Sequence, residues 1–235
     1  MGRLDNKIVL ISAGFAGSPH IWVPQLVEEG ATVIIGGHSN GTSNVAETID
    51  DPRIHRISLD VSLEQSWQAA FKVISGKFGG IDVLINAAAV SLSGDTLEEC
   101  TAETWSETLS VNLDGAFLGC KQAVNVMAPA GRGSIINVTS VLGRVANGTS
   151  IAYTASMAGV RLLTRSVALY CATTRTGIRC NSICSGYQPE SPEAGNARGA
   201  SALPDIGGLA VYLASDASIS CTGADFVVDN AFSIT

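Results

Sequence analysis

Residues 134–174 read SIINVTSVLGRVANGTSIAYTASMAGVRLLTRSVALYCATT, and their hydrophobic pattern predicts a strand, a loop and a helix in succession. Residues 135–140 form a short apolar run that ends in hydroxyl side chains, as expected of a buried strand. From Thr154 onward, apolar residues recur at helical spacing, namely Met157, Val160, Leu163 and Val167. Ser140 is therefore expected at the C-terminal end of a strand and Tyr153 at the beginning of a helix.

Segments of strand length and helix length alternate along the whole chain. We expect strands at residues 7–12, 31–36, 54–59, 81–86, 134–139, 178–183 and 224–228. We expect helices at residues 21–29, 45–50, 63–78, 97–127 (broken near Cys100 and ended by Pro129), 155–174 and 204–214. Strands that alternate with helices are joined by right-handed crossovers and form a parallel sheet. The sequence thus predicts a single α/β domain over residues 1–235, with a doubly wound parallel sheet of about seven strands and helices on both faces.

Ser140 and Tyr153 are placed where a parallel sheet binds ligands, outside the carboxyl ends of its strands. Their segment resembles the active site of the short-chain dehydrogenase/reductase family, in which a serine lies thirteen residues before a tyrosine and a lysine four residues after it. The chain has Ser140 and Tyr153 at this spacing but Met157 in place of the lysine. The resemblance covers roughly residues 4–230 and implies a Rossmann-like fold.

Met157 changes the chemistry expected of Tyr153. A free tyrosine has a pKa of about 10, so only about one molecule in a thousand is ionised near pH 7. In the family, the lysine ammonium favours the ionised tyrosine and also holds the nicotinamide ribose. Met157 lies one helical turn from Tyr153 but carries neither charge nor hydrogen-bond donors. We therefore expect Tyr153 to stay a neutral phenol that donates a proton but is a poor base, whether or not Met157 simply fills the core.

The first turn between a strand and a helix departs from the family's phosphate-binding motif, Thr-Gly-x-x-x-Gly-x-Gly. Residues 12–19 read SAGFAGSP, so Gly17 is in register and Gly14 is one place late. Pro19 removes an N–H group from the helix N-terminus that would bind a phosphate. These changes predict a vestigial dinucleotide site and favour a protein without a cofactor.

Four further positions correspond to family residues that bind the cofactor or relay protons. His38 follows the second strand, where relatives have an acidic residue for the ribose hydroxyls or an arginine for a 2′-phosphate, and the alternative is a solvated loop histidine without a ligand. Asp60 matches the family's adenine-contacting aspartate, although it could equally cap the following helix. Asn86 begins Asn-Ala-Ala-Ala, where the family has Asn-Asn-Ala-Gly. Asn112 matches the asparagine that positions a water in the proton relay, and the alternative is a purely structural amide.

Composition excludes several classes of function. A formal net charge of −7 without a basic run argues against nucleic-acid binding. The chain has no apolar stretch of about 18 residues and no signal-peptide pattern, so we expect a cytoplasmic protein that does not enter membranes. Six cysteines without a Cys-x-x-Cys pair and three histidines do not suggest a metal site.

Two regions bear on access to the site and on assembly. The polar segment 187–203 stands where the family has a longer lid, which predicts a site that is open or covered by a partner subunit. The helices at 104–127 and 155–174 match those through which the family forms dimers and tetramers, so the resemblance implies a homo-oligomer.

Three functions are compatible with these features. The favoured hypothesis is an enzyme that no longer transfers hydride and uses Ser140 and Tyr153, with Asn112, for acid/base chemistry on a small carbonyl or hydroxyl substrate. Isomerase, lyase, dehydratase and cyclase reactions are of this type. The second hypothesis is an NAD(P)-dependent oxidoreductase of reduced activity. The third is a non-catalytic subunit that stabilises an active relative.

Overall fold

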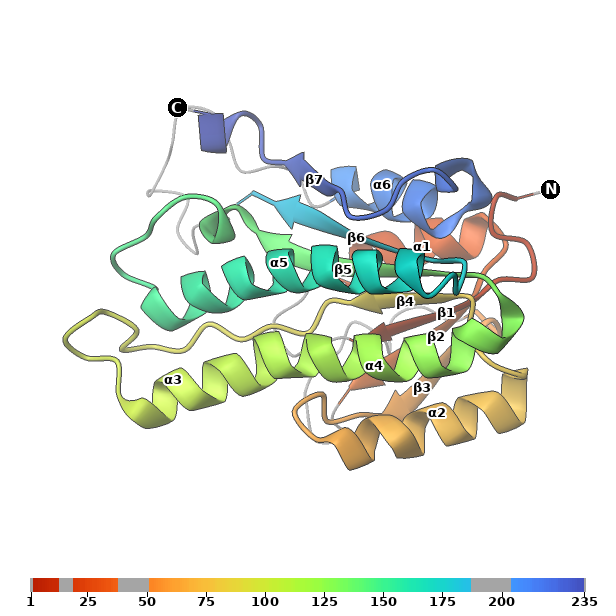
Figure 1. Cartoon of the computed structure of the whole chain (residues 1–235), viewed down its shortest axis with the longest axis horizontal. Helices are drawn as coiled ribbons and strands as arrows, with labels where there is room; N and C mark the ends of the chain where they lie inside the picture. Colours follow the sequence, from red (N-terminus) through yellow and green to blue (C-terminus); the bar gives the residue numbers. More distant parts are fainter. Residues whose placement is uncertain (1, 13–18, 38–50, 187–203, 235) are drawn as a thin grey trace.

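The computed structural model describes residues 2–12, 19–37, 51–186 and 204–234. These residues form a seven-stranded parallel sheet with the strand order β3-β2-β1-β4-β5-β6-β7 (Figure 1). The strands are β1 (Ile8–Ser12), β2 (Thr32–Gly37), β3 (Ile54–Ser58), β4 (Val83–Asn86), β5 (Gly133–Ser140), β6 (Ile178–Ser185) and β7 (Asp225–Val228). Every expected strand is present with its ends shifted by at most two residues, and the predicted fold class is confirmed.

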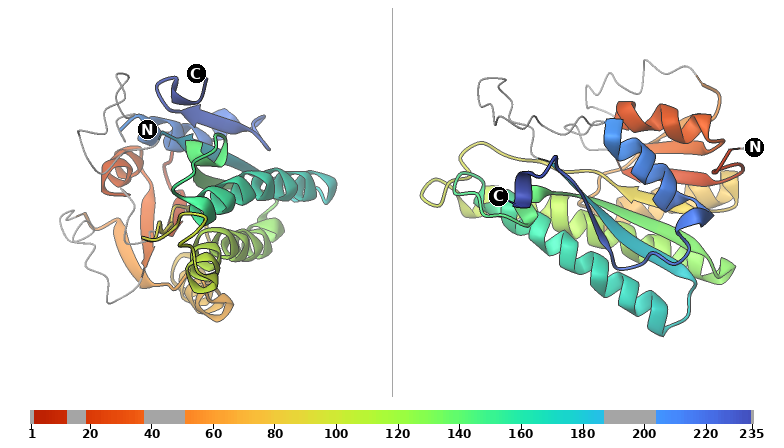
Figure 2. Two further views of the ribbon diagram at one scale, coloured as in Figure 1. Left: turned by 90° about the vertical axis from the view of Figure 1, so that its left-hand side faces the viewer. Right: turned by 90° about the horizontal axis from the view of Figure 1, so that it is seen from above.

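Helices cover both faces of the sheet (Figure 2). Helices α1 (Pro19–Glu28) and α6 (Pro204–Ala214) pack side by side on one face and bury one hydrophobic core. Helices α2 (Glu64–Phe78), α4 (Gly115–Met127) and α5 (Ile151–Thr173) cover the other face and bury a second core. The sheet is therefore doubly wound, with apolar side chains on both of its faces.

Helix α2 shows how the sequence pattern determines local structure. The four apolar residues that recur at helical spacing in this helix, Trp67, Ala70, Phe71 and Ile74, are all buried. Gly79 follows the helix with a φ of 81°, a left-handed conformation that glycine adopts readily, and its N–H donates to the carbonyl oxygen of Ser75.

The helix predicted over residues 97–127 is divided. Helix α3 (Ala102–Leu109) begins only after Thr101, whose Oγ1 accepts a hydrogen bond from the N–H of Thr104 at 3.1 Å. A π-helical turn, Ser110–Asp114, then joins α3 to α4. Pro129 lies in the 3-10 turn that follows α4, in agreement with the expected end of the helix.

Helix α5 begins at Ile151, four residues before the predicted start at 155, and thereby places Tyr153 in its first turn. The predicted helix at 45–50 and the polar segment 187–203 lie outside the described residues. Within the described chain, no helix combines the length and the apolar character needed to cross a membrane.

At the carboxyl edge of the sheet, the chain leaves the neighbouring strands β1 and β4 toward opposite faces. Ser12 at the end of β1 is in register with Asn86 at the end of β4. Strand β1 leads to α1 on one face, whereas β4 leads through α3 to α4 on the other face. The crevice at such a switch point is the usual ligand site of an open α/β sheet.

Candidate active site

Ser140 is the last residue of β5 and is 5% exposed. Its Oγ accepts a hydrogen bond from the N–H of Leu142 at 3.2 Å, which closes the 3-10 turn Val141–Gly143. The sequence predicted this location, because an apolar run ending in hydroxyls is typical of a buried strand that reaches the sheet edge.

Tyr153 is half-buried in the first turn of α5, and its backbone is held by a residue that sequence reasoning missed. The Asp95 carboxylate accepts hydrogen bonds from the N–H of Ala152 at 2.7 Å and of Tyr153 at 3.1 Å. The Asp95 carbonyl oxygen accepts another from the N–H of Ile151 at 2.9 Å. One signal could have found it: the first turn of α5 contains no acidic residue, so its N–H groups need a partner from elsewhere in the chain.

Asn112 lies in the π-helical turn and is 2% exposed. Its Nδ2 donates to the carbonyl oxygen of Val90 at 2.9 Å and to Ser156 Oγ at 3.0 Å. Ser156 Oγ in turn donates to the carbonyl oxygen of Tyr153 at 2.7 Å. The structure thus links Asn112 to Tyr153 through one hydroxyl. Because an amide nitrogen has two hydrogens and both are engaged, the side chain has no further donor for a water.

Asp60 follows β3 and shapes the turn before α2. Its Oδ1 accepts hydrogen bonds from the N–H of Ser62 at 3.0 Å and from Ser62 Oγ at 2.6 Å. The residue at the N-cap position of α2 is Leu63, so Asp60 is not the helix cap that one interpretation expected.

Asn86 is directed into the core between β4 and α4. Its Nδ2 donates to Asn137 Oδ1 at 2.8 Å and to the carbonyl oxygen of Ala116 at 3.3 Å. Asn86 Oδ1 is buried and has no hydrogen-bond partner among the described residues. Gly119 faces this oxygen so closely that an added Cβ would lie 2.5 Å from it. The remaining predicted cofactor residues, Gly14, Gly17 and His38, lie outside the described residues.

Met157 is 2% exposed and lies one turn after Tyr153. It lines a small cavity of about 10 Å³ at the switch point together with Ser12, Asn86 and Asn112. A cavity of this size holds about one water molecule. All the described residues that line it are uncharged, so none of them replaces the family's lysine charge there.

A network of charged side chains anchors the turn that follows Ser140. Asp225 Oδ2 accepts hydrogen bonds from Arg144 Nη1 at 2.9 Å and Arg161 Nε at 2.8 Å, while Asp225 Oδ1 accepts one from Ser182 Oγ at 2.7 Å. Burial of the Asp225 carboxyl would raise its pKa. The hydrogen bonds from Ser182 and Arg161, with the positive charge of Arg161, outweigh this effect and lower the pKa below its ordinary value.

Comparison with known proteins identifies the class that this fold and site define. Residues 22–233 match the family model described as enoyl-(acyl carrier protein) reductase. The chain is 40% identical to the 3-alpha-(or 20-beta)-hydroxysteroid dehydrogenase of Mycobacterium tuberculosis, over 97% of this chain and 90% of the relative. It is 34% identical to the NADP-dependent (R)-specific alcohol dehydrogenase of Lentilactobacillus kefiri, over 98% of both chains. The chain belongs to the short-chain dehydrogenase/reductase family.

A solved structure, the crystal structure of gox2181, superposes with a TM-score of 0.90 at 29% sequence identity. The matched region covers 99% of this chain and 98% of the gox2181 chain. The Rossmann-like fold is therefore confirmed.

These relatives overturn two predictions. Curated proteins with 32–40% identity over most of the chain are named as dehydrogenases, which contradicts the hypothesis of non-redox chemistry. The expectation that the chain works without a cofactor is wrong for the same reason. Both predictions gave too much weight to local changes. The changes at residues 12–19 affect how strongly a nucleotide binds, and Met157 affects proton transfer, but the serine-tyrosine pair and the rest of the fold are kept.

Proposed function

We propose that this protein is an NAD(P)-dependent oxidoreductase that interconverts a hydroxyl and a carbonyl group on a small molecule. The observation that carries the proposal is the placement of Ser140 and Tyr153 at the carboxyl edge of the sheet, one on β5 and the other in the first turn of α5. The relatives support it, because their names describe oxidation of steroid, alcohol, cyclohexanecarboxylate and sugar-alcohol hydroxyl groups.

The proposed position of the dinucleotide is the crevice at the switch point between β1 and β4, whose following helices lie on opposite faces of the sheet. The cavity of about 10 Å³ lined by Ser12, Val61 and Ala88 lies at this point but holds only about one water molecule, so it is not itself the nucleotide site. Asp60 follows β3 and is the candidate residue for contacting the adenine of the nucleotide. A nicotinamide cofactor bound in this crevice would supply or accept the hydride.

Proton transfer depends on residues of this chain. Tyr153 donates a proton to the carbonyl oxygen during reduction, and Ser140 Oγ donates a hydrogen bond to the same oxygen. Oxidation of an alcohol needs the reverse transfer, from the substrate to an ionised Tyr153. Since Met157 offers no positive charge to favour that ionised form, and both directions pass through the same transition state, we expect reduction and oxidation to be slowed by similar factors.

Assembly as a homo-oligomer is part of the proposal. Helices α4 and α5 carry exposed apolar side chains, among them Phe117, Leu169 and Tyr170. A groove of about 340 Å³ between these helices is lined by Phe117, Leu163, Val167 and Tyr170. An exposed apolar surface of this kind on a family of oligomeric proteins is best explained by a second copy of the chain.

The function is tested by calorimetric titration of the purified protein with NADH and with NADPH, followed by initial rates on ketones and secondary alcohols. We expect saturable binding of at least one nucleotide and turnover only when that nucleotide is present. Absence of binding at millimolar nucleotide, or turnover that does not depend on it, would contradict the proposal.

A further inference from the structure

Helix α5 does not supply its own N-terminal cap. The side chain of Ser150, at the N-cap position, makes no capping hydrogen bond within the described chain, and the first turn has no acidic residue. The first N–H groups of a helix have no partner inside the helix, and leaving them buried without one is costly. The turn that carries Tyr153 must therefore be held from outside.

Asp95 provides all of this support from a segment 57 residues earlier in the chain. It is 3% exposed and lies between β4 and α3. Its carbonyl oxygen and its two carboxylate oxygens accept from three consecutive N–H groups, those of residues 151, 152 and 153. A carboxylate at this position also interacts favourably with the positive end of the helix dipole.

The same segment holds Tyr153 from its other side. Val90 binds Asn112 through both its N–H, which donates to Asn112 Oδ1 at 2.7 Å, and its carbonyl oxygen. Asn112 donates to Ser156, which donates to the carbonyl oxygen of Tyr153. The backbone of Tyr153 is thus fixed at its N–H by Asp95 and at its carbonyl oxygen by a chain of contacts that begins at Val90.

We propose that Asp95 is a positioning residue for Tyr153, which fixes the phenol relative to Ser140 and ties it to the segment that follows β4. The catalytic part of this inference rests on the proposed oxidoreductase function. Proton transfer requires near-ideal geometry, and a misplacement of about 1 Å can reduce the rate about 100-fold. Asp95 therefore affects turnover through Tyr153 without itself contacting the substrate.

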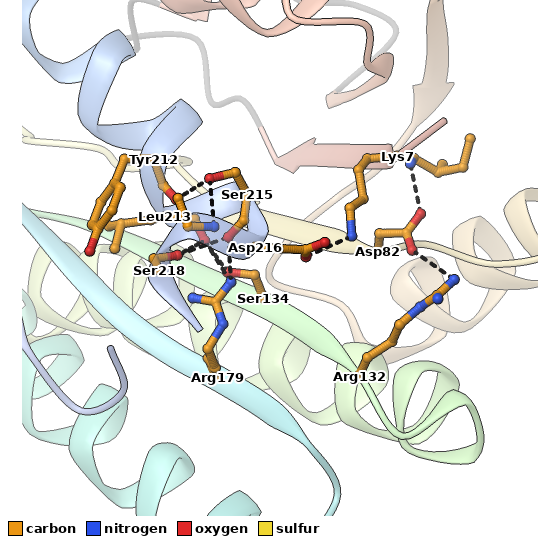
Figure 3. Close-up of polar contacts among 12 residues, drawn as sticks. Lys7, Asp82, Arg132, Ser134, Arg179, Tyr212, Leu213, Ser215, Asp216 and Ser218 are labelled. Atoms are coloured by element: carbon orange, nitrogen blue, oxygen red, sulfur yellow. Dashed lines mark hydrogen bonds and ion pairs between the residues drawn. The ribbon is translucent and has the colours of Figure 1, made fainter. Parts of the chain in front are cut away.

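The test compares Asp95→Ala and Asp95→Asn with a matched carboxylate at the opposite edge of the sheet. Asp82 is shown there with Lys7 and Arg132 (Figure 3), and its Oδ2 accepts a hydrogen bond from the N–H of Ile8 at 2.9 Å. Like Asp95, it is a carboxylate that binds a backbone N–H group, but it lies far from Tyr153 along the strands. Asp82→Ala is therefore the control for a general loss of stability.

Three quantities are measured for each variant: kcat, the dissociation constant of the nucleotide, and amide hydrogen exchange in residues 149–156. For Asp95→Ala we expect kcat to fall about 30- to 100-fold while nucleotide affinity stays within about 2-fold, because the switch-point crevice is untouched. Asp95→Asn keeps one acceptor oxygen, so its kcat should lie between those of the wild type and Asp95→Ala. Exchange in residues 149–156 should accelerate in both Asp95 variants and not in Asp82→Ala.

The outcomes separate this inference from the proposed function. If Asp95→Ala lowers kcat and nucleotide affinity by similar factors, Asp95 has only a general structural role and the inference is overturned. The same holds if Asp82→Ala loses as much kcat as Asp95→Ala. If the wild type shows no turnover, the proposed function fails, and hydrogen exchange alone decides whether Asp95 holds the first turn. If Asp95→Ala does not fold, Asp95→Asn decides by the same criteria.

Discussion

Arg161 Nη1 donates a hydrogen bond to the carbonyl oxygen of Gly143 at 2.8 Å, and this contact joins α5 to the turn that follows Ser140. Gly143 packs so closely on α5 that an added Cβ would lie 2.8 Å from the carbonyl carbon of Met157. The serine and the tyrosine thus belong to two segments that are joined directly. Asp225 also links the two segments, because it forms ion pairs with Arg144 in the turn and with Arg161 on α5.

We predict that Asp225→Asn destabilises the protein by about 3 kcal/mol near pH 7, because it leaves two guanidinium groups without a buried counter-charge. The folded-state pKa of Asp225 lies below its ordinary value, so the unfolded chain takes up the proton first as the pH falls. The contribution of Asp225 is therefore present above about pH 4 and is lost as the pH falls through the folded pKa.

Urea denaturation of the wild type and Asp225→Asn between pH 3 and pH 7 measures this difference. The gap in the free energy of unfolding should narrow toward pH 3. Glu64→Gln is the control, because it breaks the exposed ion pair with Lys121 and should cost little at any pH. A gap that stays constant with pH would refute the role of the Asp225 charge.

Tyr153→Phe should reduce turnover about 100- to 10,000-fold, since it removes the hydroxyl that donates the proton. Nucleotide affinity should remain within about 3-fold of the wild type, because the aromatic ring is kept. Initial rates and calorimetry measure the two effects. Tyr170→Phe, an exposed position on the same helix, should leave turnover unchanged, and retention of turnover in Tyr153→Phe would exclude the proposed acid.

Met157→Lys should raise the rate of alcohol oxidation at least about 10-fold at neutral pH, because an ammonium group one turn from Tyr153 favours the ionised phenol. The same change should lower the melting temperature, because Met157 is buried against Gly143. Met157→Leu keeps the side-chain volume without adding a charge, so it should change the rate of alcohol oxidation by no more than about 2-fold. If the lysine variant folds and oxidises no faster, the assigned role of this position is wrong.

Tyr170→Glu should shift the protein toward a monomer, because it places a charge in the apolar groove between α4 and α5. Molar mass by light scattering after size exclusion measures this. Val73→Glu is the matched control, since Val73 on α2 is as exposed as Tyr170, at 57%. A monomeric wild type would contradict the proposed assembly.

The sequence pattern was sufficient to predict most of the fold. Strand positions were predictable because each strand is a continuous apolar run, and α2 because its buried residues recur at helical spacing. The start of α5 was placed four residues late. The lack of an acidic residue in the first turn of α5 indicates that a partner is needed, but no local pattern identifies that partner as Asp95, which lies far away in the chain.

The candidate site was predicted in part. Ser140 and Tyr153 were placed at the sheet edge by the element pattern, and their spacing indicated the family. The partners of Asn112, Asp60 and Asn86 were not predictable, because each depends on which backbone groups the fold brings near. The reaction type was predicted wrongly, because the consequence of Met157 for proton transfer was extended to hydride transfer, which is a separate step.

The π-helical turn at Ser110–Asp114 makes the helical unit from α3 to α4 one residue longer than a continuous α-helix would need. Because an α-helix turns by about 100° per residue, deleting a single residue here would rotate α3 by that angle about its axis relative to α4. Asn112 would then point away from Val90 and Ser156. In a homologue, a one-residue gap at this position would therefore indicate that the hydrogen-bond chain from Asn112 through Ser156 to the Tyr153 carbonyl oxygen is lost, even where serine and tyrosine are both retained.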